Sequence, residues 1–174
     1  LLPLTIWSFH GAELGIVAEA VLLALALASH MRSHERARHH AEHLARTDVL
    51  TGLSNRRAFM EQARGLWNTA QRRGRPLSAV MLDIDHFKAI NDRYGHEGGD
   101  QVLIRVAELL RQSCRAGDLS ARWGGEEFLL LLPETDLAQA IAFAERLRLS
   151  IAGCTIMLGA QPVGVTVSLG VAQM

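Results

Sequence analysis

The apolar positions change their spacing along the chain, and the spacing predicts which segments are helices and which are strands. From Thr47 onward, short unbroken apolar runs are typical of buried strands, whereas residues 99–115 repeat apolar side chains at helical intervals. The apolar helix positions there are Val102, Leu103, Val106, Leu109 and Leu110. The predicted strands are 77–82, 118–123, 129–132, 154–158 and 163–171. Strands interleaved with helices predict one compact domain whose helices flank a sheet.

Polar residues and glycines predict where the other helices begin and end. One helix follows the loop 50–55, with Ser54 or Asn55 as its N-cap, and a break at Gly74 and Pro76 ends it. Residues 87–92 form a predicted short helix that is broken at Gly95. Asp136 is predicted to cap the last helix, whose expected inward side chains are Ala140, Ile141, Ala144, Leu147 and Ile151.

Residues 1–30 differ from the rest because they are almost entirely apolar. Residues 14–28 contain a single charged side chain, Glu19, and a membrane span needs about 20 apolar residues. We interpret the segment as the last helix of a multi-helix membrane domain, with Glu13 and Glu19 facing its interior. A buried soluble helix and a signal-peptide remnant are the alternatives.

Residues 29–47 continue as a predicted helix, because they lack Pro and Gly and are rich in Ala, Arg, Glu and His. A weak heptad pattern favours a coiled-coil linker. Arginines outnumber acids after the apolar segment, and this asymmetry predicts that the following residues are cytoplasmic. The predicted organisation is a membrane segment over 1–30, a helical signalling linker over 31–47 and a compact domain over 48–174.

Five histidines lie between residues 30 and 43, and the pairs His30/His34 and His39/His43 are each one helical turn apart. Such pairs can bind a metal ion. A solvated or interhelical surface is the commoner use of this pattern, so both interpretations stay open.

The composition of the 174 residues excludes some partners. Lys+Arg and Asp+Glu both number 18, so neither a basic excess nor a polybasic tail indicates a nucleic-acid partner. Cys114 and Cys154 lack metal-ligand spacing and are interpreted as inert thiols in a reducing compartment. The chain starts at Leu1 and stops at Met174 just after a strand-like run, so we expect a fragment cut at both ends.

The most informative motif is Gly124-Gly125-Glu126-Glu127-Phe128, which lies between two predicted strands. Two glycines there predict a tight hairpin with a type I′ turn, because that turn needs positive φ at both central positions. Two carboxylates follow at the mouth of the hairpin. Acidic side chains beside a bare glycine backbone suit Mg²⁺ together with a phosphorylated ligand.

A second acidic pair, Asp83 and Asp85, follows the buried strand 77–82. Ligands of α/β folds collect at the carboxyl ends of strands. Mg²⁺ is usually shared between one or two carboxylates and substrate phosphates. We therefore predict that Asp83 and Glu126 come within reach of one cation, and side chains on opposite sides of the molecule would refute this.

Five ordered motifs, spread over about residues 46–172, resemble the GGDEF family of diguanylate cyclases in its Gly-Gly-Glu-Glu-Phe variant. They read Asp48-Val-Leu-Thr-Gly-Leu-Ser-Asn-Arg-Arg-Ala-Phe59, Asp83-Ile-Asp-His-Phe-Lys-Ala-Ile-Asn-Asp92, Gly95-His-Glu-Gly-Gly-Asp100, Arg122-Trp-Gly-Gly-Glu-Glu-Phe128 and Val165-Thr-Val-Ser-Leu-Gly-Val171. The resemblance implies an α+β fold, with a central and mostly antiparallel sheet flanked by helices, similar to nucleotide cyclases and polymerase palms. It also implies that residues 48–174 condense two GTP molecules into cyclic di-GMP and release two pyrophosphates.

The resemblance assigns roles to individual residues. The implied ligands of Mg²⁺ or Mn²⁺ are Asp83, the Ile84 carbonyl, Glu126 and Glu127. Glu127 is also a candidate for activating the ribose hydroxyl, and Lys88 is a phosphate-side catalytic lysine. The implied substrate-binding residues are Phe87, Asn91, Asp100, Gly124 and Gly125, of which Asn91 and Asp100 would read guanine.

Arg115-Ala-Gly-Asp118 resembles the inhibitory product-binding site of the family, and Arg146 aligns with a second arginine of that site. A surface ion pair is the alternative meaning of this pattern. The resemblance further implies a homodimer, because each half-site holds one GTP and two half-sites must face each other. The implied location is the bacterial inner membrane, with the catalytic domain in the cytoplasm and the helix 29–47 setting the dimer geometry.

One departure and two rival functions accompany the resemblance. Members of the family continue past the strand 163–171 into a helix whose Lys and Arg contact the terminal phosphates, so we expect this segment alone to bind GTP poorly or not to turn it over. One rival is a catalytically silent domain that serves as a GTP or cyclic di-GMP receptor. The presence of Asp83, Asn91, Glu126 and Glu127 argues against it, because degenerate members of the family usually lose some of these residues. The other is a class III nucleotide cyclase or polymerase-palm enzyme, which the full motif set opposes.

Overall fold

The computed structural model describes residues 46–174, and a five-stranded sheet with the order β1-β3-β4-β2-β7 forms the centre of this region. Its strands are β1 (Ser54–Asn55), β2 (Leu77–Ile84), β3 (Leu119–Arg122), β4 (Glu127–Pro133) and β7 (Val167–Gln173). β1 runs parallel to β3, and the other pairs are antiparallel. A separate two-stranded sheet consists of β5 (Thr155–Leu158) and β6 (Gln161–Gly164). The predicted α+β fold with a mostly antiparallel sheet is confirmed.

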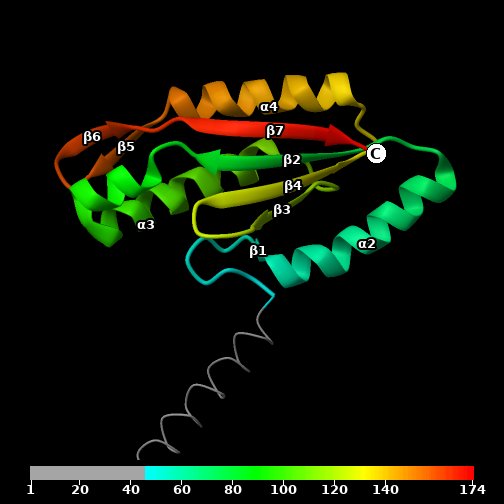
Figure 1. Cartoon of the computed structure of the whole chain (residues 1–174), viewed down its shortest axis with the longest axis horizontal. Helices are drawn as coiled ribbons and strands as arrows, with labels where there is room; N and C mark the ends of the chain where they lie inside the picture. Colours follow the sequence, from blue (N-terminus) through cyan, green and yellow to red (C-terminus); the bar gives the residue numbers. More distant parts are fainter. Residues whose placement is uncertain (1–45) are drawn as a thin grey trace, which may run out of the picture. The chain divides into compact units, whose positions relative to one another are not determined.

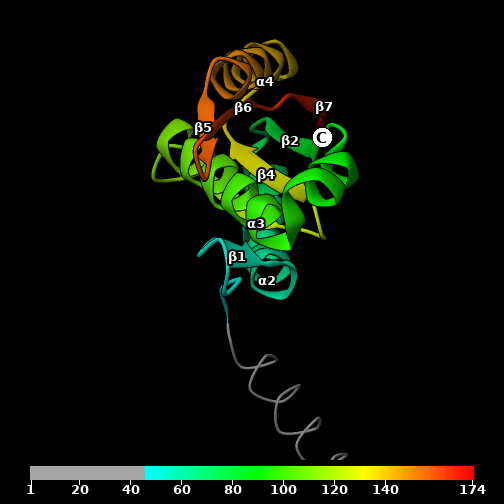
Figure 2. The same cartoon turned by 90° about the vertical axis from the view of Figure 1, so that its left-hand side faces the viewer.

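The helices of the described region are α2 (Arg56–Arg73), α3 (Phe87–Ser113) and α4 (Leu137–Ala152). Figure 1 shows α4 lying along β7, and both views place α4 and α2 on opposite sides of the sheet (Figure 2). The sheet and its helices thus form a layered domain.

Alternation along the strands decides which side chains face which helices. Val80, Leu82 and Ile84 of β2 are 0–1% exposed and belong to the large core that includes residues of α3 and α4. On the other face, Leu131 of β4 packs in a smaller cluster with Phe59 of α2. Because successive strand residues point to opposite faces, the remaining odd-numbered positions of β2 and β4 lie on the α2 side of the sheet.

Short-range chemistry sets the helix ends as predicted. The Asn55 side chain accepts a hydrogen bond from the Ala58 N–H at 2.9 Å and caps α2, and Gly74 ends that helix with φ 60°. Asp136 and Gln139 form a reciprocal capping box at the start of α4. Gly95, with φ 74° and ψ 171°, kinks α3 at the predicted break, although the helix resumes at once and runs to Ser113.

Three local predictions are wrong. Gly124 and Gly125 are not in the left-handed region and lie in a four-residue connection between β3 and β4, so the hairpin has no type I′ turn. Ile141 is 52% exposed because its position on α4 faces away from the sheet. The run 163–171 is interrupted, since β6 ends at Gly164 and β7 starts at Val167.

Within residues 46–174 no helix is both long and apolar enough to cross a bilayer. The predicted membrane helix over 1–30, nearly all of the predicted linker over 31–47 and the histidine cluster lie outside the described residues.

Candidate active site

Strands β2 and β4 bring two of the predicted carboxylates together. Asp83 pairs directly with Glu127 in the antiparallel register. Directly opposed residues have Cβ atoms about 4.5–5.5 Å apart and share one face of the sheet. Glu126 precedes β4 in the connection from β3. The acids therefore lie at one end of one strand pair, but the cross-strand partner of Asp83 is Glu127 and not Glu126.

The connection between β3 and β4 is shaped around Glu127. Its backbone oxygen accepts hydrogen bonds from the N–H groups of Trp123 at 2.8 Å and Gly124 at 3.3 Å. A Cβ on Gly124 would lie 2.5 Å from Glu127 Oε2, so the carboxylate rests against bare backbone. Glycine at position 124 is therefore required for the observed position of the Glu127 carboxylate.

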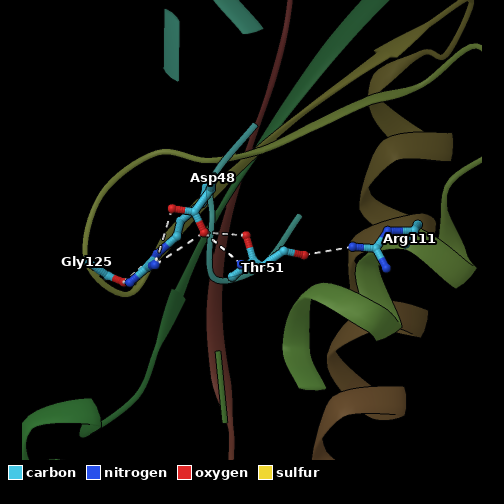
Figure 3. Close-up of polar contacts among 5 residues, drawn as sticks. Asp48, Thr51, Arg111 and Gly125 are labelled. Carbon is cyan, nitrogen blue, oxygen red and sulfur yellow. Dashed lines mark hydrogen bonds and ion pairs between the residues drawn. The ribbon is translucent and has the colours of Figure 1, made fainter. Parts of the chain in front are cut away.

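Arg122, the last residue of β3, connects this hairpin to the loop before β1 (Figure 3). Its Nε and Nη2 donate to the Gly125 carbonyl oxygen at 3.1 and 2.7 Å, and its Nη1 donates to the Asp48 carboxylate at 3.3 and 3.4 Å. The Thr51 N–H and hydroxyl donate to Asp48 Oδ1 at 2.9 and 2.7 Å. Arg111 of α3 donates to the Thr51 carbonyl oxygen at 2.8 Å. We call Asp48, Thr51, Arg111 and Arg122 the hairpin bracket.

The bracket is partly shielded from water, since the side chains of Arg122 and Asp48 are 18% and 22% exposed. Burial acts to raise the pKa of Asp48, but hydrogen bonds from Thr51 and the charge of Arg122 outweigh it and hold that pKa below its usual value. Asp48 is therefore ionised at neutral pH. Asp48 and Arg122 belong to two of the sequence motifs, but the sequence predicted no role for either residue.

Asp85 is directed toward β7. Both of its carboxylate oxygens accept hydrogen bonds, from the Ser168 hydroxyl at 2.6 Å and the Thr166 hydroxyl at 2.7 Å. The hydrogen bond from Ser168 and then that from Thr166 lower the pKa of Asp85. The sequence reasoning grouped Asp85 with Asp83 as a possible ligand and missed this pairing, which joins residues more than 80 positions apart.

The donor set suits a cation that also binds phosphate. Within residues 46–174 no three His, Cys, Asp or Glu side chains converge closely enough to hold a metal ion by themselves. Mg²⁺ is commonly held by one or two carboxylates plus substrate phosphates and water. The opposed pair of Asp83 and Glu127 meets that requirement, and the predicted Mg²⁺ or Mn²⁺ ligation stays a prediction.

The predicted guanine readers lie around the kink in α3. A Cβ on Gly99 would be 2.0 Å from Asn91 Oδ1 and 3.1 Å from Phe87 Cζ, so the Asn91 amide lies against the backbone that immediately precedes Asp100. Asp100 is exposed. Phe87 is only 7% exposed and belongs to the large core, where it supports the first turn of α3. Lys88, on that same turn, is exposed to solvent.

The residues of the predicted inhibitory site line one cavity of about 230 Å³ at the other end of β3 and β4. Arg115, Asp118 and Arg146 all contribute to its wall, together with Thr135 and Phe143. Sites that enclose a whole drug-sized ligand measure about 300–1,000 Å³. A dinucleotide would therefore rest partly outside this cavity.

The guanidinium of Arg115 is held in place on one side. Its Nε donates to Asp118 at 3.1 Å, and its Nη2 donates to the Pro133 carbonyl oxygen at 2.9 Å and to the Thr135 hydroxyl. The predicted alternative, an ion pair, is thus present, with the Asp118 side chain only 3% exposed. These bonds leave Nη1 of Arg115 for a ligand.

Comparison with known proteins identifies the family. Residues 45–174 match the family described as "Diguanylate cyclase, GGDEF domain". The response regulator PleD of Caulobacter vibrioides is 47% identical over 130 residues, which are 74% of this chain and 29% of PleD. Diguanylate cyclase DgcP of Pseudomonas aeruginosa is 46% identical over 127 residues, which are 73% of this chain and 19% of DgcP. The chain thus spans less than a third of these relatives.

Solved structures agree with the sequence match. The GGDEF domain of DgcB from Caulobacter crescentus, in complex with c-di-GMP, superposes with a TM-score of 0.71 and 32% identity over 74% of this chain and 75% of that one. The active GGEEF domain of a Vibrio cholerae diguanylate cyclase superposes with a TM-score of 0.66. The two are 34% identical over 70% of this chain and 77% of that one. Since the family match covers most of the sequence and relatives above 40% identity support it, the chain belongs to the GGDEF-domain family of diguanylate cyclases.

Proposed function

We propose that the chain is the catalytic part of a diguanylate cyclase that joins two GTP molecules into cyclic di-GMP and releases two pyrophosphates. The observation that carries the proposal is the opposed pair of Asp83 and Glu127 beside the glycine hairpin. Membership of a family whose curated relatives include named diguanylate cyclases supports it.

The proposed chemistry repeats one displacement twice. The 3′-oxygen of one GTP forms a bond to the α-phosphorus of the other, the bond from that phosphorus to its bridging oxygen breaks, and pyrophosphate leaves. The hydroxyl proton passes to a base, for which Glu127 is the candidate. Mg²⁺ or Mn²⁺, held by Asp83, the Ile84 carbonyl and the hairpin glutamates, would neutralise charge on the phosphates when bound.

The other residues would bind and orient the nucleotide. The Asn91 amide can both donate and accept, and the Asp100 carboxylate can accept from the N–H groups of guanine. The ammonium group of Lys88 would attract the phosphates. Gly124 and Gly125 leave the backbone open to close approach.

A homodimer and a membrane anchor are part of the proposal. One half-site holds one GTP, so two copies related by a twofold axis would complete the reaction. The apolar residues 1–30 would anchor the protein in the bacterial inner membrane, with residues 48–174 in the cytoplasm. The helix 29–47 would then transmit a signal to the dimer.

Chromatography of the products formed from GTP and Mg²⁺ by the full-length protein tests this function. Cyclic di-GMP is the expected product. Tight binding of GTP or cyclic di-GMP without turnover would instead indicate a silent receptor domain. Cyclic GMP or a nucleic-acid chain would indicate a different nucleotidyl-transfer enzyme.

We further propose that cyclic di-GMP inhibits its own synthesis at the cavity of Arg115, Asp118 and Arg146. The charge of the two arginines suits the phosphates of the product, and the Asp118 carboxylate can accept from guanine N–H groups. Arg115→Ala should relieve product inhibition while synthesis continues. Arg148→Ala is the matched control, because Arg148 lies on α4 outside the cavity and pairs with Glu145. Unchanged inhibition in Arg115→Ala would remove the assignment.

A further inference from the structure

The start of strand β7 is joined to the end of β2 by a three-residue polar cluster. The Asp85 N–H donates to the Thr166 carbonyl oxygen at 3.0 Å, and the Asp85 carboxylate accepts from the hydroxyls of Thr166 at 2.7 Å and Ser168 at 2.6 Å. Ionised acceptors make such hydrogen bonds about twice as strong as neutral ones. We call Asp85, Thr166 and Ser168 the β7 clamp.

The clamp lies at the start of an edge strand. Within residues 46–174, β7 is an edge strand of its sheet and pairs with β2 alone. Its chain arrives from the separate β5–β6 sheet, so the first residues of β7 are held by the main sheet on one side only. Strand ends with a single partner open more easily than central strands do.

The end of β2, to which the clamp ties β7, carries the candidate metal ligands Asp83 and Ile84. Ser168 is the direct partner of Asp83 across β2 and β7, so the clamp and Asp83 share the α2 face of the sheet. Backbone groups of successive strand residues point to opposite neighbouring strands. Because the Asp85 N–H points to β7, the Ile84 carbonyl points to β4 and the glutamate hairpin. A loose start of β7 would therefore free the end of β2 that carries Asp83 and Ile84.

The hydrogen bonds of Asp85 link β2 to β7 and do not direct its carboxylate to a metal ion. Both of its oxygens accept hydroxyl hydrogen bonds, and within residues 46–174 it does not join two other acidic or histidine side chains in a metal-sized group. The hydroxyls hold its charge on the β7 side, which leaves Asp83 and Glu127 as the opposed pair.

We propose that Asp85 is a positioning residue, which locks β7 to β2 through Thr166 and Ser168 and so holds Asp83 and the Ile84 carbonyl in place for a phosphate-bound divalent cation. The link to catalysis rests on the proposed function, whereas the lock itself does not.

Hydrogen exchange of the full-length protein tests the lock. Asp85→Ala and the double variant Thr166→Val/Ser168→Ala should each speed exchange of the amides at positions 85 and 168, which point across the β2–β7 pair, by about tenfold or more, since each variant removes charge-assisted hydrogen bonds. Asp85→Asn should fall between the wild type and Asp85→Ala, because an amide can accept from one hydroxyl and donate to the other but lacks the charge. The control Thr155→Val/Ser150→Ala removes the same two hydroxyl types from exposed positions. Unchanged exchange in both disrupting variants would overturn the proposal.

Binding of Mn²⁺ in the presence of GTP, followed by electron paramagnetic resonance, tests the consequence for the site. Asp85→Ala and Thr166→Val/Ser168→Ala should weaken Mn²⁺ binding by similar factors, and combining all three changes should add little. If Asp85→Ala abolished Mn²⁺ binding while the hydroxyl variant retained it, Asp85 would be a ligand and the proposal would be wrong. If Asp85→Ala failed to fold, the hydroxyl variant and Asp85→Asn would still decide. If the wild type makes no cyclic di-GMP but the variants show the expected exchange pattern, the proposed function alone would be refuted.

Discussion

Glu127 combines two tasks in one residue. Its backbone oxygen closes the hairpin, and its carboxylate lies on the bare backbone of Gly124 opposite Asp83. Because the backbone task does not depend on the side chain, the chemistry of the carboxylate can be changed without disturbing the turn.

Glu127→Gln should therefore abolish synthesis and leave the fold intact. General-base catalysis contributes about 10²–10⁴-fold, so we expect the rate of cyclic di-GMP formation to fall by at least about 100-fold. The midpoint of thermal unfolding should stay near that of the wild type. Glu145→Gln, at an exposed position of α4, is the control. A rate within about threefold of wild type would refute the assignment of Glu127.

Cys114 should be an unreactive thiol. Burial and then the charge of Asp118 raise its pKa to about 11, despite a hydrogen bond from Ser120. Since the thiolate is the nucleophile, iodoacetamide at pH 8 should modify Cys114 at least about tenfold more slowly than a model thiol peptide. Mass spectrometry of timed digests measures the rate, and equal rates would contradict the burial argument.

At the scale of elements, the hairpin bracket joins three segments that are far apart in sequence. Asp48→Asn keeps an acceptor for Thr51 but removes the charge that pairs with Arg122. We expect a loss of about 1 kcal/mol in the free energy of unfolding at pH 7, since hydrogen bonds to charged groups contribute roughly 1.5–3 kcal/mol and part of the contact survives. The rate of synthesis should fall as well, because Arg122 also holds the Gly125 carbonyl.

The difference in the free energy of unfolding between the wild type and Asp48→Asn should shrink in acid. The folded pKa of Asp48 lies below its usual value of 3.8, so its contribution is fully present above pH 3.8 and is lost as the pH falls through the folded pKa. Urea unfolding of both proteins at pH 7, 5 and 3 should show a difference that shrinks only at pH 3. A difference that grows in acid would contradict the ion pair. Glu61→Gln, which changes an exposed pair, should show little effect at any pH.

These elements also show how far sequence reasoning reached. Asn55, Gly95 and Asp136 were predicted to cap or break helices because each acts through hydrogen bonds or dihedrals a few residues away. The Gly124-Gly125 turn was predicted wrongly because contacts of Glu127 and Arg122, and not the glycines alone, decide its path. The pairings of Asp85 with Thr166 and of Asp48 with Arg122 were not predicted, since they span 81 and 74 residues. The hydrogen bonds from Thr51 to Asp48 span only three residues and were missed as well. The motifs predicted which residues lie near the candidate site. The hydrogen bonds between residues far apart in sequence became visible only in the structure.

At the scale of the whole molecule, the proposed dimer should depend on the phase of the helix that the sequence predicts over 29–47. Deleting two residues between positions 35 and 44 would turn one helix end by about 200°, whereas deleting seven would turn it by only about 20° from the original direction. In the full-length protein, the two-residue deletion should change the rate of cyclic di-GMP synthesis, and the seven-residue deletion should leave it near the wild-type rate. Equal rates in both would show that the helix does not set the geometry.

The contact of Asn91 with the bare backbone of Gly99 has an evolutionary consequence. Any amino-acid replacement at a glycine codon adds a Cβ, and at position 99 that atom would lie 2.0 Å from the Asn91 amide. The displaced amide would leave the position from which we propose that it reads guanine, while the strands of the sheet would keep their packing. One missense change at codon 99 would therefore remove the proposed guanine contact and leave the sheet in place.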